Sequence, residues 1–326
     1  MLQNRILRKE LYDYFTEKTT DGEKSNRDCL IDYVRAHIKD GTKSVALCFR
    51  GSFASLYYRC HQLLRIKCSR TAIIGEFDYR HSRFTNNYKQ ILDRLKTLGA
   101  NIDNFSDKDN DTTHRYVRFD LTEKKAVSRE NLAEILQIYK SLIDDFLDPA
   151  KREYAYDKKQ ICRKSHNTEK DRQQQLYAAY FLNDVLTYYD IEYTEHNSAA
   201  NNVPGRFDLL GLRKENGAYT LLLTELKSTL NACDGKSGIA KHESDYTKYL
   251  DSSFIETRKA EASSAINLLC KIFGLPELNI TPENIRQVKI KFVFSDKAIP
   301  YGEKYTPNDC RIEKEKLSSN GMEIAY

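Results

Sequence analysis

Several features are missing from this sequence of 326 residues, and their absence excludes some classes of protein. It has no tryptophan, no Cys-x-x-Cys pair, no internal repeat and no low-complexity segment. No apolar run approaches the roughly 20 residues that are needed to cross a bilayer. The N-terminal MLQNRILRKELYDYF lacks the apolar core and the cleavage site of a signal peptide. We therefore expect a soluble, globular, cytoplasmic protein that has no membrane partner.

The eight cysteines are scattered along the chain. They are Cys29, Cys48, Cys60, Cys68, Cys162, Cys233, Cys270 and Cys310. A structural zinc site needs four ligands at short spacings, and the closest group, Cys60, His61 and Cys68, has no second half. Reduced and mostly buried thiols in a cytosolic protein are the expectation.

The charge balance is only mildly basic, with 52 basic and 47 acidic residues and a formal net charge of +5. This permits a nucleic-acid partner but does not indicate one, because a protein that grips phosphates needs a local basic face. Tyrosine supplies 22 residues, and its ring and hydroxyl suit half-wet positions at interfaces and elsewhere.

Residues 1–155 are expected to form an α+β domain. Helical periodicity predicts helices over residues 3–18, 27–39, 86–98 and 128–146. Short apolar or alternating runs predict strands over residues 44–50, 55–59, 63–67, 72–80 and 115–121, with helix as an alternative for 55–59 and 63–67. Gly99 is the predicted C-terminal cap of one helix, and Ser128 is the predicted N-cap of another.

A second domain is expected over residues 156–326, after a charged segment that follows Asp148-Pro149. Its predicted helices cover residues 169–187, 239–250 and 254–273, and Leu176, Tyr180 and Leu186 are candidate core residues. Its predicted strands cover residues 191–196, 206–213, 218–228 and 288–296. Asn216-Gly217 predicts a hairpin turn between the second and third strands. The order helix–strand–strand–strand–helix–helix–strand indicates an α/β fold.

Charged residues end a strand that is apolar on both of its faces. Leu223, Glu225 and Lys227 share one face, and apolar residues fill the other, as in a central and covered strand. Charged groups near a core need partners or a function. If the turn centres on Asn216-Gly217, Asp208 of the neighbouring strand lies opposite residue 225, which brings two carboxylates and one ammonium group together.

This grouping suits phosphodiester hydrolysis. Two carboxylates provide hard oxygen ligands for Mg²⁺ or Mn²⁺, and the peptide carbonyl of Leu226 is a candidate further ligand. Such an ion neutralises phosphate charge and lowers the pKa of a bound water. A lysine beside it can orient or help to deprotonate that water.

The segments PGRFDLLGL and TELKS resemble the PD-(D/E)XK nuclease superfamily, over about residues 169–296. The resemblance implies a restriction-endonuclease-like domain with a central mixed sheet flanked by helices. It implies Asp208 and Glu225 as metal ligands and Lys227 as the group that positions the water. In the family an acidic residue follows a proline, whereas here Gly205, Arg206 and Phe207 separate Pro204 from Asp208.

Two further features of the family have counterparts in this chain. The helix before the strands often supplies an acid, for which Glu169 is the first candidate and Glu192 on the next strand the second, while Gln173 or Gln174 stands where an acid is expected. The RecB-like branch carries Gln-x-x-x-Tyr on the helix after E-x-K. His242 and Tyr246 have that spacing, with Lys241 beside them, and are candidates for contacting nucleic acid.

Each of these candidate residues also has a simpler interpretation, without a catalytic or binding role. Asp208, Glu225 and Lys227 also fit an exposed cross-strand salt-bridge ladder, His242 and Tyr246 fit an ordinary helix surface, and Glu169 fits a solvated acid in a first turn. A second basic and aromatic cluster, in residues 78–89, is a candidate for binding phosphates and bases or a solvated loop before a helix. Its members are Arg80, His81, Arg83, Tyr88 and Lys89.

The sequence thus predicts a metal-dependent endonuclease, with DNA favoured over RNA as its substrate. The N-terminal domain is expected to recognise the substrate, bind an activating ligand or mediate dimerisation, and a homodimer would allow a double-strand cut. Host defence or restriction is implied by the resemblance alone. The alternatives are an RNA-cleaving nuclease activated through its N-terminal domain, and a catalytically inactive nucleic-acid-binding protein on the same fold.

Overall fold

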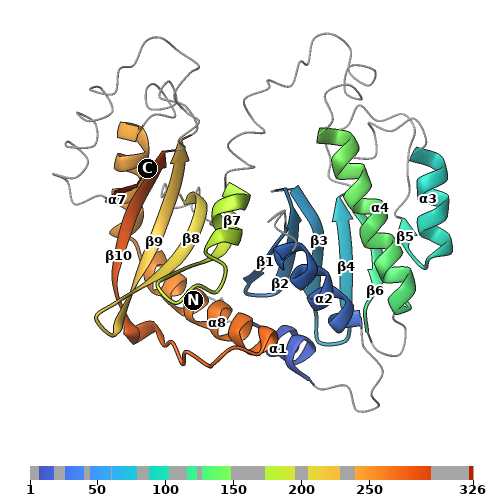
Figure 1. The fold of residues 1–326 in the computed structure, drawn as a ribbon, viewed down its shortest axis with the longest axis horizontal. Helices are drawn as coiled ribbons and strands as arrows, with labels where there is room; N and C mark the ends of the chain where they lie inside the picture. The colour runs from blue at the N-terminus through green and yellow to red at the C-terminus, as the bar shows by residue number, and fades with distance from the viewer. Residues whose placement is uncertain are drawn as a thin grey trace, which may run out of the picture. The chain divides into compact units, whose positions relative to one another are not determined.

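Two compact units make up the chain. Contacts between Cα atoms place residues 7–167 in an N-terminal unit and residues 168–326, with 1–6, in a C-terminal unit. The computed structural model (Figure 1) describes residues 7–17, 26–39, 45–59, 61–78, 88–102, 116–122, 127–147, 173–194, 205–227, 239–294 and 323–325. The predicted boundary between residues 155 and 156 lies outside the described residues.

A six-stranded antiparallel sheet, in the order β1-β2-β3-β4-β6-β5, forms the N-terminal unit. Its strands are β1 (Val45–Arg50), β2 (Phe53–Tyr58), β3 (His61–Cys68), β4 (Ile73–Asp78), β5 (Asn101–Ile102) and β6 (Tyr116–Asp120). The five predicted strands are confirmed, and the helical alternative for the second and third was wrong. β5 was not predicted, because two residues are too few to show an alternating pattern.

Helices α1 (Lys9–Thr16), α2 (Asn26–Lys39), α3 (Tyr88–Thr97) and α4 (Arg129–Leu147) complete the described part of this unit. The Ser128 cap is confirmed, because its Oγ accepts the backbone N–H of Asn131 at 3.1 Å. Gly99, just after α3, has a φ of 98°, which a residue with a side chain rarely adopts. Both signals were local, and both placed the helix ends correctly.

One face of this sheet is apolar and carries the helices. Phe15 of α1 packs edge-on against Phe49 of β1, with ring centroids 5.0 Å apart. Tyr139 of α4 stacks on Phe77 of β4 at 3.6 Å. Helix α2 contacts β1 and α4, and Figure 1 shows α2 and α4 over the same side of the sheet. The core of this unit therefore lies between the sheet and its helices.

A five-stranded mixed sheet, in the order β11-β10-β9-β8-β7, forms the C-terminal unit. Its strands are β7 (Leu186–Thr194), β8 (Arg206–Glu215), β9 (Ala218–Lys227), β10 (Ile285–Phe294) and β11 (Glu323–Ala325). Strands β7, β8 and β9 are antiparallel, whereas β10 runs parallel to both β9 and β11. The α/β character and the mixed sheet are as expected, while β11 was not predicted.

The turn between β8 and β9 sets the register of the sheet. Asn216 and Gly217 have φ values of 48° and 79°, the two left-handed residues of a type I′ hairpin turn. Glu215 therefore pairs with Ala218, and the ladder continues to Leu209 opposite Thr224. The predicted hairpin is confirmed at its turn and along its length.

Helices α7 (Ile239–Leu250) and α8 (Phe254–Phe273) have the predicted bounds. A short 3-10 helix, Pro282–Asn284, precedes β10, and residues 173–179 are helical. Helix α8 ends at Gly274, whose φ of 69° is left-handed and whose N–H bonds the carbonyl oxygens of Cys270 and Lys271. This end also follows the prediction.

The prediction of a helix up to residue 187 was wrong. The helix ends at residue 179, Leu182 then takes a left-handed φ of 51°, and the side chain of Asn183 accepts the N–H groups of Val185 and Leu186 at 3.0 and 3.3 Å. An asparagine that bonds the backbone in this way favours a turn over a helix. Strand β7 consequently begins at Leu186, which is buried as expected, while Tyr180 is 38% exposed against expectation.

Four of the cysteines lie in the described residues, and all four are buried. They are Cys29, Cys48, Cys68 and Cys270. Burial raises the pKa of the Cys68 thiol to about 12, so this group stays protonated near neutral pH. In the part of the chain that the structure describes, no helix has both the length and the apolar character to span a membrane.

Candidate functional site

Asp208 and Glu225 come together at one end of the C-terminal sheet. Leu209 of β8 pairs with Thr224 of β9, so the next residue along each strand, Asp208 and Glu225, shares a level and a face. Each residue is only 8% exposed. An exposed salt-bridge ladder is therefore the wrong description of these two carboxylates.

A hydrogen bond from β9 holds the carboxylate of Asp208, which belongs to the neighbouring strand β8. Its Oδ2 accepts the backbone N–H of Leu226 at 2.7 Å. A hydrogen bond to a carboxylate is stronger than one between neutral groups, so it fixes both the side chain and the end of β9. Leu226, whose carbonyl is a candidate ligand, is thereby held beside Asp208.

Two side chains of α7 converge on Glu225. His242 Nε2 lies 3.1 Å from Oε1, and the Tyr246 hydroxyl lies 2.5 Å from Oε2. His242 and Tyr246 are four residues apart, so one face of the helix presents both. Helix α7 thus brings the predicted pair, His242 and Tyr246, into contact with Glu225 of β9. The alternative, an ordinary helix surface, was wrong for this pair.

Tyr246 is held as a neutral hydrogen-bond donor. Its side chain is 1% exposed, and its ring lies 4.9 Å from that of Phe207. Burial, and next the negative charge of Glu225, hold the pKa of Tyr246 well above its ordinary value. The hydroxyl also lies 3.0 Å from the carbonyl oxygen of Arg206, so its single proton has two acceptors within reach.

Strand β7 adds two acidic residues to the same face. Asp190 pairs with Leu210. Ile191 pairs with Leu209 and Tyr193 with Phe207, so Glu192, between them, lies opposite Asp208. Glu192 has a φ of 53° and is half-buried, and its Oε2 lies 3.4 Å from the Arg206 guanidinium. Glu192 is therefore directed towards Arg206 at the edge of the site.

Asp190 was missed by the sequence reasoning. It is fully buried, and its Oδ1 accepts the N–H of Ile191 at 2.8 Å. The signal was present in the sequence, because an aspartate inside the run LTYYDIEYT is unusual for a strand interior. The strand prediction began one residue too late, at 191, to include it.

Gln173 and Gln174 occupy the helix before β7 and are 1% and 2% exposed. The Oε1 of Gln173 is buried, and no hydrogen-bond partner for it lies among the described residues. Buried amides thus stand where the family resemblance led us to expect an acid.

The remaining predicted residues divide into two groups. Lys241 and Lys89 are exposed, and Lys241 is paired with Asp245 on α7. Lys227 ends β9 with its backbone opposite Phe294 of β10, but its side chain lies outside the described residues. Also outside them are Glu169, Arg80, His81 and Arg83.

Among the described residues, no group of three or more His, Cys, Asp or Glu side chains could hold a metal ion. Of the predicted metal ligands, Asp208 and Glu225 lie on one buried face and offer carboxylate oxygens. Carboxylate oxygens are the ligand type that Mg²⁺ and Mn²⁺ prefer, and Mg²⁺ usually keeps several waters and takes only one or two carboxylates. The chemistry of this donor pair therefore fits a hard divalent cation that completes its shell with water and substrate.

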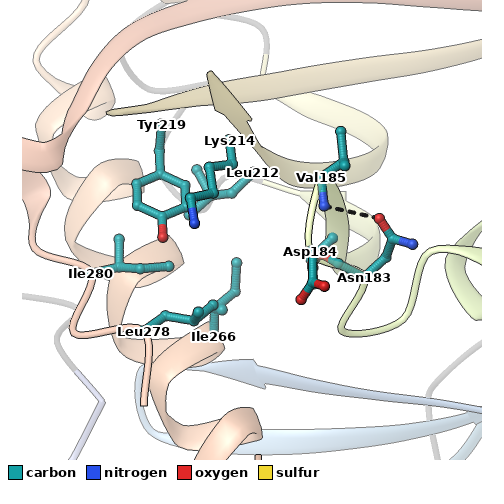
Figure 2. A pocket seen from close by; sticks show the side chains of 10 residues that line it. Asn183, Asp184, Val185, Leu212, Lys214, Tyr219, Ile266, Leu278 and Ile280 are labelled. Atoms are coloured by element: carbon teal, nitrogen blue, oxygen red, sulfur yellow. Dashed lines mark hydrogen bonds between the residues drawn. The ribbon is translucent and has the colours of Figure 1, made fainter. Parts of the chain in front are cut away.

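A cavity of 190 Å³ opens near the other end of this sheet (Figure 2). Strand residues Leu212, Lys214 and Tyr219 line it together with Ile266 of α8. Tyr219 is six positions before Glu225 on β9, which is about 20 Å along a strand. The cavity is therefore separate from the carboxylate site.

No family model matches this chain, and it shows no significant similarity to a curated protein or to a solved structure.

Proposed function

We propose that the C-terminal unit is a metal-dependent nuclease that hydrolyses phosphodiester bonds, with DNA as its preferred substrate. The observation that carries this proposal is the pair Asp208 and Glu225, buried on one face where the E-x-K strand ends. The order of elements supports it: a helix, three antiparallel strands, two helices and a strand parallel to the third. This is the order of elements that the sequence predicted.

Asp208 and Glu225 would hold the cation, and the carbonyl oxygen of Leu226 is the next candidate ligand. Two buried carboxylates on neighbouring strands repel each other, and a divalent cation offsets that repulsion. When bound, the ion supplies charge neutralisation at the phosphate and a water of lowered pKa. The carboxylates thus have a physical reason to be adjacent.

The chain's own residues prepare the site. The Leu226 N–H fixes one carboxylate, and His242 and Tyr246 fix the other through its two oxygens. Such support keeps ligands in one orientation before substrate arrives. Lys227, two residues after Glu225, would orient the attacking water, and Lys241 and His242 would contact the phosphate backbone.

A second candidate function is a nucleic-acid-binding protein on an inactive nuclease fold. The observation that favours it is that both oxygens of Glu225 already have partners on α7. If metal binding displaced His242 and Tyr246 from Glu225, the binding energy of the ion would have to exceed the energy of these two contacts. An RNA-cleaving enzyme has the same site, because the ion acts on a phosphate in either case.

The test is a cleavage assay with plasmid DNA, single-stranded DNA and RNA, each in Mg²⁺, Mn²⁺ or EDTA. Lys227→Ala and Glu225→Gln should abolish metal-dependent cutting, while Lys248→Ala, an exposed lysine of α7, should leave it intact. Linear plasmid as an early product would indicate a paired cut by a dimer. Equal cutting by wild type and both site variants would refute the assignment.

A further inference from the structure

The N-terminal sheet has a second face, which differs sharply from its helix-covered face. The strand register places Phe53 of β2 opposite Lys67 of β3, and Arg65 of β3 opposite Glu76 of β4. Glu76 in turn pairs with Arg118 of β6, two positions from Tyr116. We define the basic face by these six residues. They are Phe53, Arg65, Lys67, Glu76, Tyr116 and Arg118.

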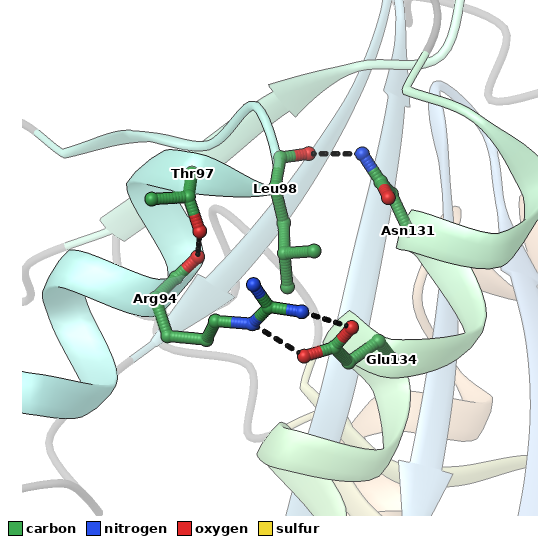
Figure 3. A network of polar contacts seen from close by, with 5 residues as sticks. All are labelled: Arg94, Thr97, Leu98, Asn131 and Glu134. Atoms are coloured by element: carbon green, nitrogen blue, oxygen red, sulfur yellow. Dashed lines mark hydrogen bonds and ion pairs between the residues drawn. The ribbon is translucent and has the colours of Figure 1, made fainter.

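The described helices of this unit lie away from the basic face. Helices α1 and α4 pack on the opposite, apolar face through Phe15 and Tyr139. Helix α3 lies on α4, where Arg94 forms a two-pronged ion pair with Glu134 at 2.6 and 2.7 Å (Figure 3). The helices therefore account for one side of the sheet only.

Three cations surround a single aromatic ring on the basic face. The charged groups of Arg65, Lys67 and Arg118 lie 5.8, 5.7 and 5.9 Å from the centroid of the Tyr116 ring. Arg65 also lies 5.3 Å from the Phe53 ring. Cations at this distance from a ring face are attracted to it, so the rings help to hold the positive charges together.

One buried carboxylate organises these cations. Glu76 has a side chain only 4% exposed, accepts a hydrogen bond from Arg118 Nε at 3.0 Å and forms an ion pair with Lys67 Nζ at 2.7 Å. Lys67 and Arg118 pair with this carboxylate, while Arg65 lies opposite Glu76 in the strand register and Asp120 of β6 adds a second carboxylate to the same face. The side chains of Lys67 and Arg118 remain 45% and 42% exposed, so part of each one reaches the surface of the basic face.

We propose that the basic face binds single-stranded nucleic acid, with phosphates at Lys67 and Arg118 and bases on the rings of Tyr116 and Phe53. The rings are half-buried, so their exposed parts offer stacking surfaces. The Arg65 guanidinium lies 5.3 Å from the Phe53 ring and 5.8 Å from the Tyr116 ring, so the two rings are close enough to contact neighbouring nucleotides of one strand. Cations beside aromatic rings are the chemistry that single strands require. An acidic peptide would satisfy the charges but would leave the rings without partners.

The inference does not depend on the nuclease proposal, because it is tested without metal. Fluorescence anisotropy would follow the full chain binding labelled oligodeoxythymidine and oligouridine of about 16 nucleotides in EDTA, over a series of salt concentrations. Tyr116→Leu should weaken binding by about 5- to 150-fold, and Tyr116→Phe, which keeps the ring, should stay within about twofold. The two oligonucleotides separate DNA from RNA.

Charge variants give a second readout, which holds even if Tyr116→Leu does not fold. Lys67→Ala should lower the salt dependence of log Kd by about one and weaken binding to every sequence alike. The matched control is Lys96→Ala, because Lys96 is exposed on α3. The proposal is overturned if wild type binds neither oligonucleotide, if folded Lys67→Ala binds as wild type does, or if polyglutamate of equal charge competes equally well.

Discussion

Replacing Tyr246 by phenylalanine should destabilise the C-terminal unit while keeping the ring in place. The change removes a hydroxyl that lies 2.5 Å from Glu225, in a side chain that is 1% exposed. Hydrogen bonds to charged groups contribute about 1.5–3 kcal/mol, and burial protects this one from screening by solvent. Because Glu225 keeps His242, we expect a loss of about 2 kcal/mol in the free energy of unfolding.

The assay is urea denaturation followed by far-ultraviolet circular dichroism, since the chain has no tryptophan to report by fluorescence. Tyr180→Phe is the matched control: Tyr180 is 38% exposed, so its loss of a hydroxyl should change stability by less than about 0.5 kcal/mol. In a Glu225→Ala background, Tyr246→Phe should have little further effect, because its partner is already gone.

Equal losses from Tyr246→Phe in the wild-type and Glu225→Ala backgrounds would refute this reasoning. The hydroxyl would then act through another group, such as the carbonyl oxygen of Arg206 at 3.0 Å. The claim that α7 holds the carboxylate in place would fail with it.

Three further predictions concern stability. The Tyr139 hydroxyl is buried without a hydrogen-bond partner among the described residues, so Tyr139→Phe should raise the free energy of unfolding by about 1 kcal/mol, as measured by urea denaturation. The pKa values of Tyr139 and Tyr246 are held well above the ordinary value, chiefly by burial, so both stay protonated in the folded state while the unfolded chain ionises near pH 10. Stability should therefore be intact below pH 10 and fall above it by about 1.4 kcal/mol per pH unit for each such tyrosine, and Tyr139→Phe should make that fall less steep. Gly217→Ala should lower stability by about 1–2 kcal/mol, because a φ of 79° strains any residue that has a Cβ, whereas an unchanged thermal midpoint would contradict this.

The C-terminal hairpin could be predicted because its signals are local. Asn216-Gly217 determines the turn, the turn determines the register, and the register brings Asp208 to the level of Glu225. Apolar periodicity failed before β7, because it extends the helix through residues 180–185, where Leu182 is left-handed and the Asn183 side chain bonds the backbone of a turn.

The basic face could not be predicted, because its residues are far apart in the sequence. Arg65 and Arg118 reach one ring only after β4 pairs with β3 on one edge and with β6 on the other. No local pattern encodes such pairing. The alternation of residues along a strand shows which side of the sheet each one faces, but it does not show which strand lies beside it. The sequence instead drew attention to residues 78–89, where basic and aromatic residues are adjacent along the chain.

Isothermal titration with Mn²⁺ would measure whether Asp208 and Glu225 bind the divalent cation that the proposed cleavage requires. Wild type and Glu277→Gln, which removes an exposed carboxylate of the same unit, should bind Mn²⁺ with equal affinity. Glu225→Gln should weaken that binding by more than about tenfold, because it removes a charged ligand. Equal Mn²⁺ affinity in all three proteins would contradict the assignment, and so would a wild-type protein that cleaves DNA without binding the ion.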